Sequence, residues 1–522
     1  MFNGMGQHKK QGSKQNIKSE RHTGSGGQRE QARKFSAPVW LYPACFALLL
    51  AVVAFNCFYR LGQLPALDWD EARHGVSAYE MLKNGNFLVN TYAGQPDYWN
   101  LKPPLSFWCI ALGYKLFGYN LFGMRFYSAL AFSLTALAAG LFARRRYGKT
   151  ASLAVLLLIS CCAPFYRYHF ARHGDADALF LLFAVLAVFS AALVRENIGY
   201  LYACGLLLSL SFLAKSWYAL PVLGVIGLYF ILSKRIRLPR APQWALFALC
   251  ALSPALLWAA ARFGCDGMKF LGGMAGTDLV NRSAQALEGH AGGAFYYIQM
   301  LFSASPAAGA FALCIGLYFA FLKVTAVREG GLPLDGNLKE DFPLYLVWVF
   351  LPLFLFSLAQ TKTTWYAVPL FFPIVLLGGL LFARAMQGGK KLTGTKVILC
   401  LLLAALAIPS YVGTWNVLQP SYQDDLQPFL AQQLASDGRL HGKNAYLVIE
   451  NPLTPGQWDQ SYLLLGELYL DFNCKPGGVK EFLSSPGSVL VISAKEYGQN
   501  GAALQGCTVV SRSSGFLCLT KN

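Results

Sequence analysis

The stretch LDWDEARHGVSAYEM, residues 67–81, brings Asp68, Asp70, Glu71 and Arg73 together in one short segment. It closely follows an apolar run near 38–59 that is long enough to cross a membrane. A simple membrane anchor would need no carboxylates at this place. The segment therefore indicates a function beyond anchoring, and that function depends on how the rest of the chain crosses the membrane.

The composition is that of a polytopic α-helical membrane protein. Hydrophobic residues make up 55% of the 522 residues and charged residues only 13%, whereas soluble proteins carry roughly 25% charged residues. Eleven apolar runs approach membrane-spanning length, near 38–59, 120–143, 150–166, 177–194, 199–214, 217–233, 243–262, 295–322, 343–359, 366–384 and 397–415. The sequence thus predicts about 11–13 transmembrane helices. A shorter apolar stretch at 105–118 is expected to lie at the membrane interface as a helix.

Positive charge collects on one side of these spans. The N-terminal 37 residues are rich in Lys and Arg, and basic clusters follow the second, sixth and tenth spans at 144–146, 234–240 and 390–396. The positive-inside rule places all of them in the cytoplasm, so the N-terminus lies inside and the C-terminus outside. The net charge of +18 therefore reflects topology rather than binding to nucleic acid. Residues 1–37 are too polar to form a core and are expected to be a disordered tail.

The chain changes character near residue 416. Buried strands are expected at NAYLVIE (444–450) and SVLVIS (488–493), a helix at YLLLGELYLDF (462–472) and a closing hairpin at CTVVSRSSGFLCLT (507–520). The predicted domains are a transmembrane domain at 38–415, with an outer loop at 60–118, and an extracytoplasmic α/β domain at 416–522.

Acidic, basic and aromatic side chains converge on the outer face from five separate loops. Besides the opening segment, these loops carry Lys102, Asp175, Asp177, Lys215, Asp278, Arg282, His290, Lys362 and Tyr366. An ionised side chain in the membrane interior costs roughly 2.5–3.5 kcal/mol, so ionisable residues at span ends usually pair with one another or with a ligand. Purely structural roles are also open: Asp177 could cap a helix and Lys215 could extend to the membrane surface. Arg73 could simply pair with Glu71.

Fixed cations and carboxylates just outside a bilayer fit chemistry on a lipid phosphate. A cation can bind the phosphate, and a carboxylate can orient or deprotonate an incoming hydroxyl or phosphate. The sequence contains no Walker motif or other Gly-rich phosphate loop, and no nucleotide is expected outside the cytoplasm. We therefore predict a polyprenyl-phosphate sugar as donor, with its tail between the spans and its sugar facing outward.

The first outer loop also resembles that of a known family. The sequence DWDEARHGVSAYEMLKNGNFLVNTYAGQPDYWNLKPPLSFW, residues 68–108, is similar to the bacterial lipid A aminoarabinose transferases and their relatives among the protein mannosyltransferases, which have the GT-C fold. The shared pattern is an Asp-Glu pair, an Arg two residues later, a Glu-Met-Leu helix end, a Gly and a Lys-Pro. The likeness continues in order through DADALFLLF (175–183), FLAKSWYALP (212–221), GHAGGAFYYIQML (289–301) and TKTTWYAVPLF (361–371).

This resemblance implies a site and a reaction. Asp70 would be the catalytic carboxylate, with Glu71 beside it and Asp177 as a second acid of the cavity. The donor phosphate would contact Lys102 and Tyr366, with Arg73, Lys215 and Lys362 in the same site. We expect an inverting transfer in which Asp70 accepts the acceptor's proton or positions its oxygen, while Lys102 stabilises the departing polyprenyl phosphate. Asp68 and Glu71 are expected to orient the loop, Glu71 through Arg73.

Two departures from the family bear on the metal and the acceptor. The aminoarabinose transferases carry Glu directly before the Lys, where this chain has Leu101, so a metal site built from that Glu and a loop histidine such as His290 is not predicted. No cofactor is predicted, and dependence on a divalent metal is left open. The tract ALEGHAGGAF, residues 286–295, lacks the usual basic and aromatic residues, which weakens the case for lipid A as acceptor.

The predicted protein is a glycosyltransferase of the bacterial inner membrane with a periplasmic C-terminal domain. Its partners would be the lipid-linked donor and a lipid, glycan or protein acceptor. A membrane transporter is the first alternative, but a transporter should carry its charged residues near the membrane midplane. A catalytically inactive binding or assembly protein on the same fold is the second. The presence of Asp70, Lys102 and Tyr366 together favours the enzyme.

Overall fold

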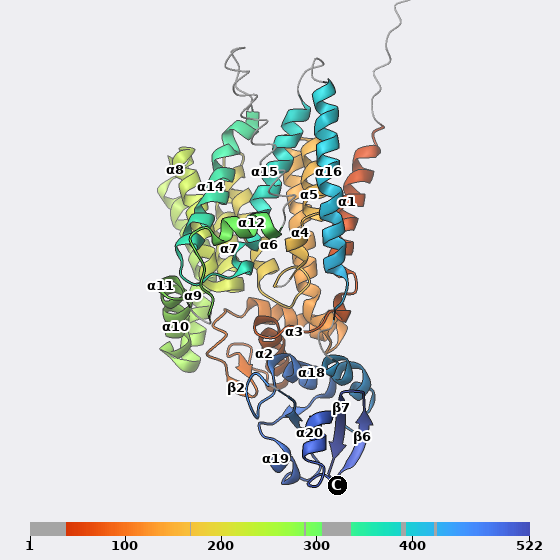
Figure 1. The fold of residues 1–522 in the computed structure, drawn as a ribbon. Helices are drawn as coiled ribbons and strands as arrows, with labels where there is room; N and C mark the ends of the chain where they lie inside the picture. Colours follow the sequence, from red (N-terminus) through yellow and green to blue (C-terminus); the bar gives the residue numbers. More distant parts are fainter. Residues whose placement is uncertain are drawn as a thin grey trace, which may run out of the picture.

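A bundle of long apolar helices makes up most of the protein (Figure 1). The computed structural model describes residues 38–167, 169–237, 239–286, 289–304, 336–387, 393–421, 425–450 and 452–521. The bundle helices are α1 (Leu41–Phe58), α4 (Leu121–Tyr147), α5 (Lys149–Ser160), α6 (Asp177–Leu193), α7 (Gly199–Lys215), α8 (Ala219–Leu232), α9 (Ala241–Asp266), α14 (Gly336–Leu358), α15 (Val368–Met386) and α16 (Thr393–Leu418). Seven stretches in these ranges are long and apolar enough to cross a membrane, which confirms a polytopic helical protein.

Ten of the eleven predicted spans coincide with these bundle helices. The eighth, 295–322, begins as α12 (Tyr296–Ala304) and then runs beyond the described residues, and the predicted tail 1–37 also lies outside them. The stretch predicted at the membrane interface is helical, as α3 (Leu105–Phe117). It packs tightly on α4, because a Cβ on Gly113 would lie 2.1 Å from the carbonyl oxygen of Gly123.

The chain turns back between α7 and α8, through a 3-10 turn at Ser216–Tyr218. Lys215, the last residue of α7, contacts Asp177, the first residue of α6. Arg235, just beyond α8, donates a hydrogen bond to the carbonyl oxygen of Ala192 near the other end of α6. The two helices therefore run in opposite directions beside α6, as expected for two successive spans.

The buried carboxylate of Asp341 binds side chains from several bundle segments, at the end of the bundle remote from the outer loop. Asp341 of α14 is fully buried and accepts hydrogen bonds from Arg146 Nη2 at 2.7 Å and from Arg235 Nη2 at 3.2 Å. The hydroxyls of Tyr147 and Tyr229 also donate to it, at 2.7 and 3.2 Å. Two basic segments that are predicted to be cytoplasmic, 144–146 and 234–240, thus meet at one carboxylate.

The C-terminal residues form a mixed five-stranded sheet flanked by short helices. Strand order is β4-β3-β5-β7-β6, with β3 parallel to β4 and β5, and β7 antiparallel to β5 and β6. The elements are α17 (Leu426–Pro428), β3 (Asn444–Val448), α18 (Gln460–Leu470), β4 (Asn473–Cys474), α19 (Val479–Leu483), β5 (Val489–Ser493), α20 (Ala494–Gln499), β6 (Thr508–Arg512) and β7 (Phe516–Thr520). The predicted strands, helix and hairpin of this α/β region are confirmed.

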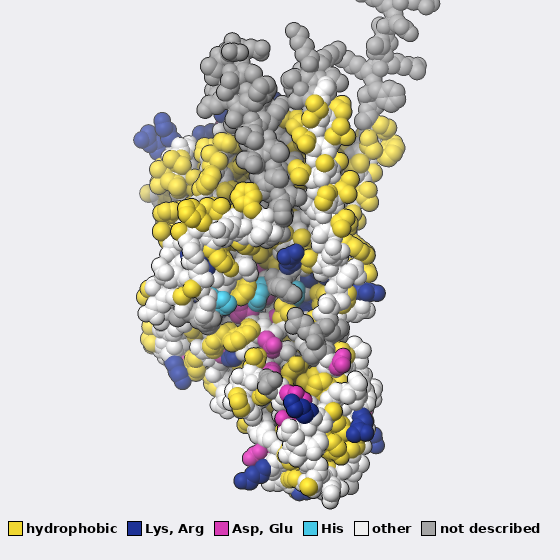
Figure 2. All heavy atoms as spheres, in the orientation of Figure 1, with side chains coloured by type: hydrophobic (Ala, Val, Ile, Leu, Met, Phe, Trp, Pro, Cys, Tyr) yellow, Lys and Arg dark blue, Asp and Glu magenta, His cyan; other side chains and the backbone are white. Residues whose placement is uncertain are grey.

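The outer loop lies between the bundle and the C-terminal sheet (Figure 1). It forms α2 (Asp70–Asn84), the short strands β1 (Thr91–Tyr92) and β2 (Gln95–Pro96), and α3. α2 packs against α18 so closely that a Cβ on Gly75 would lie 2.7 Å from the side chain of Leu464. Asp68 Oδ1 accepts a hydrogen bond from the backbone N–H of Ser461, at the start of α18. Figure 2 shows hydrophobic side chains over the upper bundle and Asp and Glu side chains gathered lower, from this junction downward.

Candidate active site

A cavity of about 450 Å³ lies where the outer loop meets the ends of the bundle helices. Its volume falls within the range of small-molecule sites in proteins. The wall combines cations, carboxylates and aromatic rings, and consists of Trp69, Asp70, Trp99, Asn100, Leu101, Lys102, His169, Lys215, Ser216, Trp217, Tyr218, Asp278, Arg282, His290, Trp365 and Tyr366. Of the residues predicted for the site, Asp70, Lys102, Lys215 and Tyr366 share this cavity.

Asp70 and Lys102 form the ion pair at the base of the site. Lys102 Nζ donates to Asp70 Oδ1 at 2.8 Å and to Asn100 Oδ1 at 3.2 Å. Burial, the largest single effect, would raise the pKa of Asp70, but the charges of Lys102, His169 and His74 together lower that pKa below the usual value. Burial likewise opposes the charge of Lys102, yet Asp70 and Asp175 together raise its pKa above the ordinary range. Both groups are therefore charged at neutral pH.

The backbone before Asp70 is unusual. Trp69 has φ of 67° and ψ of −120°, a conformation that a bulky side chain rarely adopts. This turn starts α2 at Asp70 and leaves the Trp69 ring half exposed, with its centroid 5.8 Å from that of Trp99. Strained residues of this kind persist where the surroundings hold them, often at functional sites.

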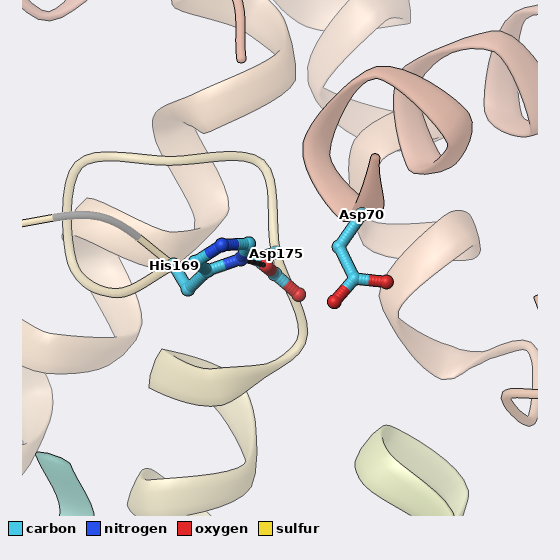
Figure 3. Close-up of side chains that lie close together, drawn as sticks. All are labelled: Asp70, His169 and Asp175. Atoms are coloured by element: carbon cyan, nitrogen blue, oxygen red, sulfur yellow. Dashed lines mark hydrogen bonds and ion pairs between the residues drawn. The ribbon is translucent and has the colours of Figure 1, made fainter. Parts of the chain in front are cut away.

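His169 and Asp175 bring a second carboxylate close to Asp70 (Figure 3). The three side chains place one ligand atom each within 4.8 Å of one another. Although burial disfavours its charge, the hydrogen bond and charge of His169 hold the pKa of Asp175 well below its usual range. These atoms could hold a divalent cation only if it displaced contacts already made, because Asp70 binds the Lys102 ammonium and Asp175 binds His169.

Asp177 lies behind the cavity wall rather than in it. Asp177 is the first residue of α6, and its carboxylate, 2% exposed, forms an ion pair with Lys215. Lys215 in turn reaches the cavity, and its ammonium lies 4.5 Å from the centre of the Tyr218 ring. Asp177 therefore holds a cavity cation in place, an ion pair that the sequence analysis did not specify.

Glu71, predicted beside Asp70 as a catalytic acid, does not line the cavity. Its carboxylate is fully buried and binds Arg125 of α4 through both oxygens, at 2.7 and 2.8 Å. It also accepts from the backbone N–H groups of Leu67 and Gly174, at 3.0 and 2.8 Å. The expected partner Arg73 is wrong, because Arg73 binds Asp97 at 2.7 Å instead. Glu71 thus fastens the outer loop to the bundle.

Two predicted phosphate ligands also lie outside the cavity wall. Arg73 pairs with Asp97 and stacks on Tyr92 and Trp99, one helical turn after Asp70. Lys362 donates to the carbonyl oxygens of Ser357 at 2.8 Å and Phe356 at 3.4 Å, in the last turn of α14. A cation there satisfies carbonyl groups that a helix end leaves unpaired.

Several charged wall residues had no role assigned from the sequence, among them Asp278 and Arg282. Arg282 Nε lies 3.2 Å from Asp278 Oδ1, and its Nη1 lies 3.4 Å from the hydroxyl of Tyr366. Both residues belong to an outer loop that was expected to contribute polar groups, but no spacing signal separates them from the other charged residues of that loop. His169 lacked such a signal as well.

Leu101 and His290, the two positions considered for a metal site, lie in the same wall. Leu101, at the position where the aminoarabinose transferases carry Glu, packs in an apolar cluster with Leu213, Trp258, Phe270 and Met274. No carboxylate can therefore come from this position. His290 packs edge-on against Trp365, at 5.7 Å between ring centroids.

Known proteins resemble this chain in sequence. The family model "Dolichyl-phosphate-mannose-protein mannosyltransferase" matches residues 101–258. The chain is 28% identical over 394 residues to undecaprenyl phosphate-alpha-4-amino-4-deoxy-L-arabinose arabinosyl transferase 1 of Pseudomonas fluorescens, covering 73% of this chain and 68% of that protein. The corresponding transferase of Edwardsiella ictaluri is 27% identical over 70% of this chain, and just under two thirds of its own length, 65%, is covered.

Solved structures show the same fold. ArnT from Cupriavidus metallidurans, bound to undecaprenyl phosphate, superposes with a TM-score of 0.66 at 16% identity, over 91% of this chain and 97% of that one. The Archaeoglobus fulgidus oligosaccharyltransferase gives a TM-score of 0.52 at 12% identity, over 89% and 70%. The chain is thus a multi-span membrane glycosyltransferase of the GT-C fold that resembles the lipid A aminoarabinose transferases.

Proposed function

We propose that the protein transfers a sugar from a polyprenyl-phosphate donor to an acceptor outside the cytoplasm, and that the cavity around Asp70 is its active site. The observation that carries this proposal is the Asp70–Lys102 ion pair, set in a cavity that Lys215 and Arg282 also line. A carboxylate among three fixed cations suits a reaction whose leaving group is an anionic phosphate. The relatives named as undecaprenyl-phosphate sugar transferases support the class of donor.

The cations bind the donor phosphate in this proposal. Lys102, Lys215 and Arg282 present ammonium and guanidinium groups to one cavity, with the hydroxyl of Tyr366 beside Arg282. Charge-assisted hydrogen bonds of this kind are stronger than neutral ones and tighten as the phosphate gains charge. The sugar then faces the aromatic rings of Trp69, Trp99 and Trp365.

Asp70 acts on the acceptor. Its carboxylate accepts a hydrogen bond from the acceptor's hydroxyl and takes up that proton as the acceptor oxygen bonds to the anomeric carbon. The bond between that carbon and the phosphate oxygen breaks on the opposite side, so the configuration inverts and polyprenyl phosphate leaves with the electron pair. Asp177 is a positioning residue, because its ion pair holds Lys215 of the cavity wall. Glu71 is also a positioning residue, because its ion pair with Arg125 fastens the start of α2, next to Asp70, to α4.

The topology follows from the charges at the two ends of the bundle. We propose that residues 38–415 form the transmembrane domain, with the cavity at the outer face and the N-terminus in the cytoplasm. Arg146 and Arg235, which meet at Asp341, then lie at the cytoplasmic end. Residues 416–522 form a periplasmic domain of an inner-membrane protein.

A transfer assay with purified protein in lipid tests the proposal. The wild type, Asp70→Asn and Lys102→Met are offered radiolabelled polyprenyl-phosphate sugars, and binding of the donor is measured separately. We expect Asp70→Asn to bind the donor but to lose about 10²–10⁴-fold in turnover. Lys102→Met should lose donor affinity as well as turnover.

Asp68→Asn is the matched control, because Asp68 is an acid of the same segment whose hydrogen bond to Ser461 an asparagine oxygen can keep. It should transfer at close to the wild-type rate. Normal turnover by Asp70→Asn would show that the assigned carboxylate is wrong. No binding of any polyprenyl donor by the wild type would refute the reaction class.

A further inference from the structure

A second cavity, larger than the active site, lies between the outer loop and the C-terminal domain. Its volume is about 1010 Å³, and its walls come from α2 and the β1–β2 turn on one side and from residues 453–476 around α18 on the other. Figure 1 shows α2, β2 and α18 meeting at this junction. Trp69 lines both this groove and the active-site cavity, so the two cavities adjoin at the residue before Asp70.

The groove contains buried oxygens that can accept hydrogen bonds from a ligand. Gln460 Oε1 from α18 has no donor among the described residues. The carboxyl groups of Glu80 from α2 and Glu467 from α18 hydrogen-bond to each other, and both side chains are about nine-tenths buried. A buried acceptor that lacks a partner costs free energy, so such an atom usually serves a ligand or an ordered water. The amide oxygen and the two carboxyl groups together suit a ligand rich in O–H or N–H donors.

The charges of the groove do not suit a phosphate. Arg73 already binds Asp97 at 2.7 Å, and Lys83 binds Asp471 at 2.8 Å. The third basic side chain of the wall, Lys475, faces an excess of carboxyl groups, because Glu80, Asp459 and Glu467 also line the groove. A phosphate group on the acceptor would therefore meet two cations that already have partners and an excess of carboxyl groups.

Aromatic rings complete the wall. Trp69 is half exposed, and Tyr92 and Trp458 lie on opposite sides of the groove, in the outer loop and in the C-terminal domain. Flat rings pack against the apolar C–H face of a sugar ring, while amide and carboxyl oxygens accept hydrogen bonds from its hydroxyls. Both requirements of a saccharide are met within one groove.

We propose that this groove binds the acceptor and that the acceptor is a saccharide, which receives the new sugar on one of its hydroxyl groups. The inference rests on the proposed function and specifies its acceptor. The saccharide lies between α2 and α18, and its terminal ring passes Trp69 so that one hydroxyl reaches Asp70. Transfer forms a glycosidic bond to that oxygen, releases polyprenyl phosphate and gives the hydroxyl proton to Asp70.

The test uses the full-length protein in lipid, a radiolabelled polyprenyl-phosphate sugar, and washed membranes from a strain of the source bacterium that lacks this gene. These membranes supply the natural acceptor without its modification. The product is treated with the mild acid that hydrolyses the donor's own glycosyl phosphate, and separately with protease. A saccharide acceptor predicts label that survives both treatments. Label released by the mild acid would identify a phosphate acceptor, and label released by protease a protein, and either result would overturn the proposal.

Variants then test the groove itself. Glu467→Ala and Gln460→Ala each remove an acceptor oxygen from the groove. We expect the apparent KM for membrane acceptor to rise about three- to tenfold, with kcat and donor affinity unchanged. Glu467→Gln keeps an acceptor oxygen and should restore most of the wild-type KM. Lys495→Ala, which removes an exposed ion pair with Glu450 elsewhere on the domain, is the control.

The possible failures are distinguishable. If the wild type neither binds the donor nor transfers its sugar, the proposed function fails and this inference falls with it. If transfer proceeds but the groove variants keep the wild-type KM, or lose kcat alone, the groove is not the acceptor site while the enzyme assignment stands.

Discussion

Adjacent acids at the start of α2 have opposite surroundings. Asp70 faces the cavity beside Lys102, whereas Glu71 is sealed against Arg125. Successive residues of a helix point about 100° apart, so only one of two neighbours can face a given cavity. The sequence predicted that these acids matter, but not which one faces inward, because that depends on a partner 54 positions away in α4.

The contacts of Lys362 predict the effect of replacing this single residue. Its ammonium donates to backbone carbonyls at the end of α14 and does not line the cavity. Lys362→Met should therefore leave donor affinity unchanged and lower the stability of the folded protein by about 1 kcal/mol. Donor affinity and the thermal midpoint of the purified variant provide the two readouts.

Lys102→Met serves as the comparison for Lys362→Met. It should show the reverse pattern, with donor affinity reduced, because Lys102 belongs to the cavity wall. A loss of donor affinity in Lys362→Met as large as in Lys102→Met would place Lys362 in the phosphate site after all, as the family resemblance implied.

At the scale of elements, the helices were the easiest part to predict. Long apolar runs have one low-cost arrangement in a bilayer, since every backbone group is paired within the helix. The reversal at 216–218 was also predicted, because Lys215 interrupts the apolar pattern. The packing of α2 on α18 was not, since it depends on a close approach at Gly75 to Leu464, nearly 400 residues later.

The buried carboxylate of Asp341 gives a prediction for the bundle. It is fully buried and binds Arg146, Arg235 and two tyrosine hydroxyls. Asp341→Asn therefore removes the buried carboxylate that the two arginines share and leaves them only the more exposed Glu196 and Glu340. Loss of one member of a buried ion pair costs about 3–5 kcal/mol. We expect a clear fall in the thermal midpoint and in the yield of folded protein.

The neighbouring acid provides the control for Asp341→Asn. Glu340 is half exposed, pairs with Arg195 at 2.9 Å and lies farther from Arg235, at 3.7 Å. Exposed pairs contribute little, at most about 1 kcal/mol, so Glu340→Gln should unfold near the wild-type temperature. Equal losses in the two variants would mean that Asp341 is not the residue that joins these helices.

At the scale of the whole molecule, the junction of the two domains should respond to pH. Burial, and then the charge of Glu80, raise the pKa of Glu467 well above its usual value, and burial raises the pKa of Glu80. Asp471 adds to this effect on Glu467 and Lys83 opposes it. The docked domains therefore bind a proton more tightly than the separated ones.

The sign of the effect follows from these raised pKa values. Docking is most stable below the ordinary carboxyl pKa and weakens as pH rises through the raised value. Hydrogen exchange in α2 and α18, corrected for its intrinsic pH dependence, should therefore speed up with pH. Glu467→Gln should weaken this dependence and leave the part that is due to Glu80. Exchange that is flat or slower at higher pH in the wild type would contradict the assignment.

The hydrogen bond between Asp68 and Ser461 also limits how early during synthesis the outer loop can reach its final structure. Its two residues are 393 positions apart, with nearly the whole bundle made between them. A ribosome adding about 5–20 residues per second needs roughly 20–80 s to cover that distance. In the proposed topology the outer loop is therefore exported early and remains without its partner while the later helices insert. Its final shape, and with it the setting of Asp70, is reached only when synthesis is nearly complete, so a nascent chain that stalls before α18 would be an enzyme without a finished active site.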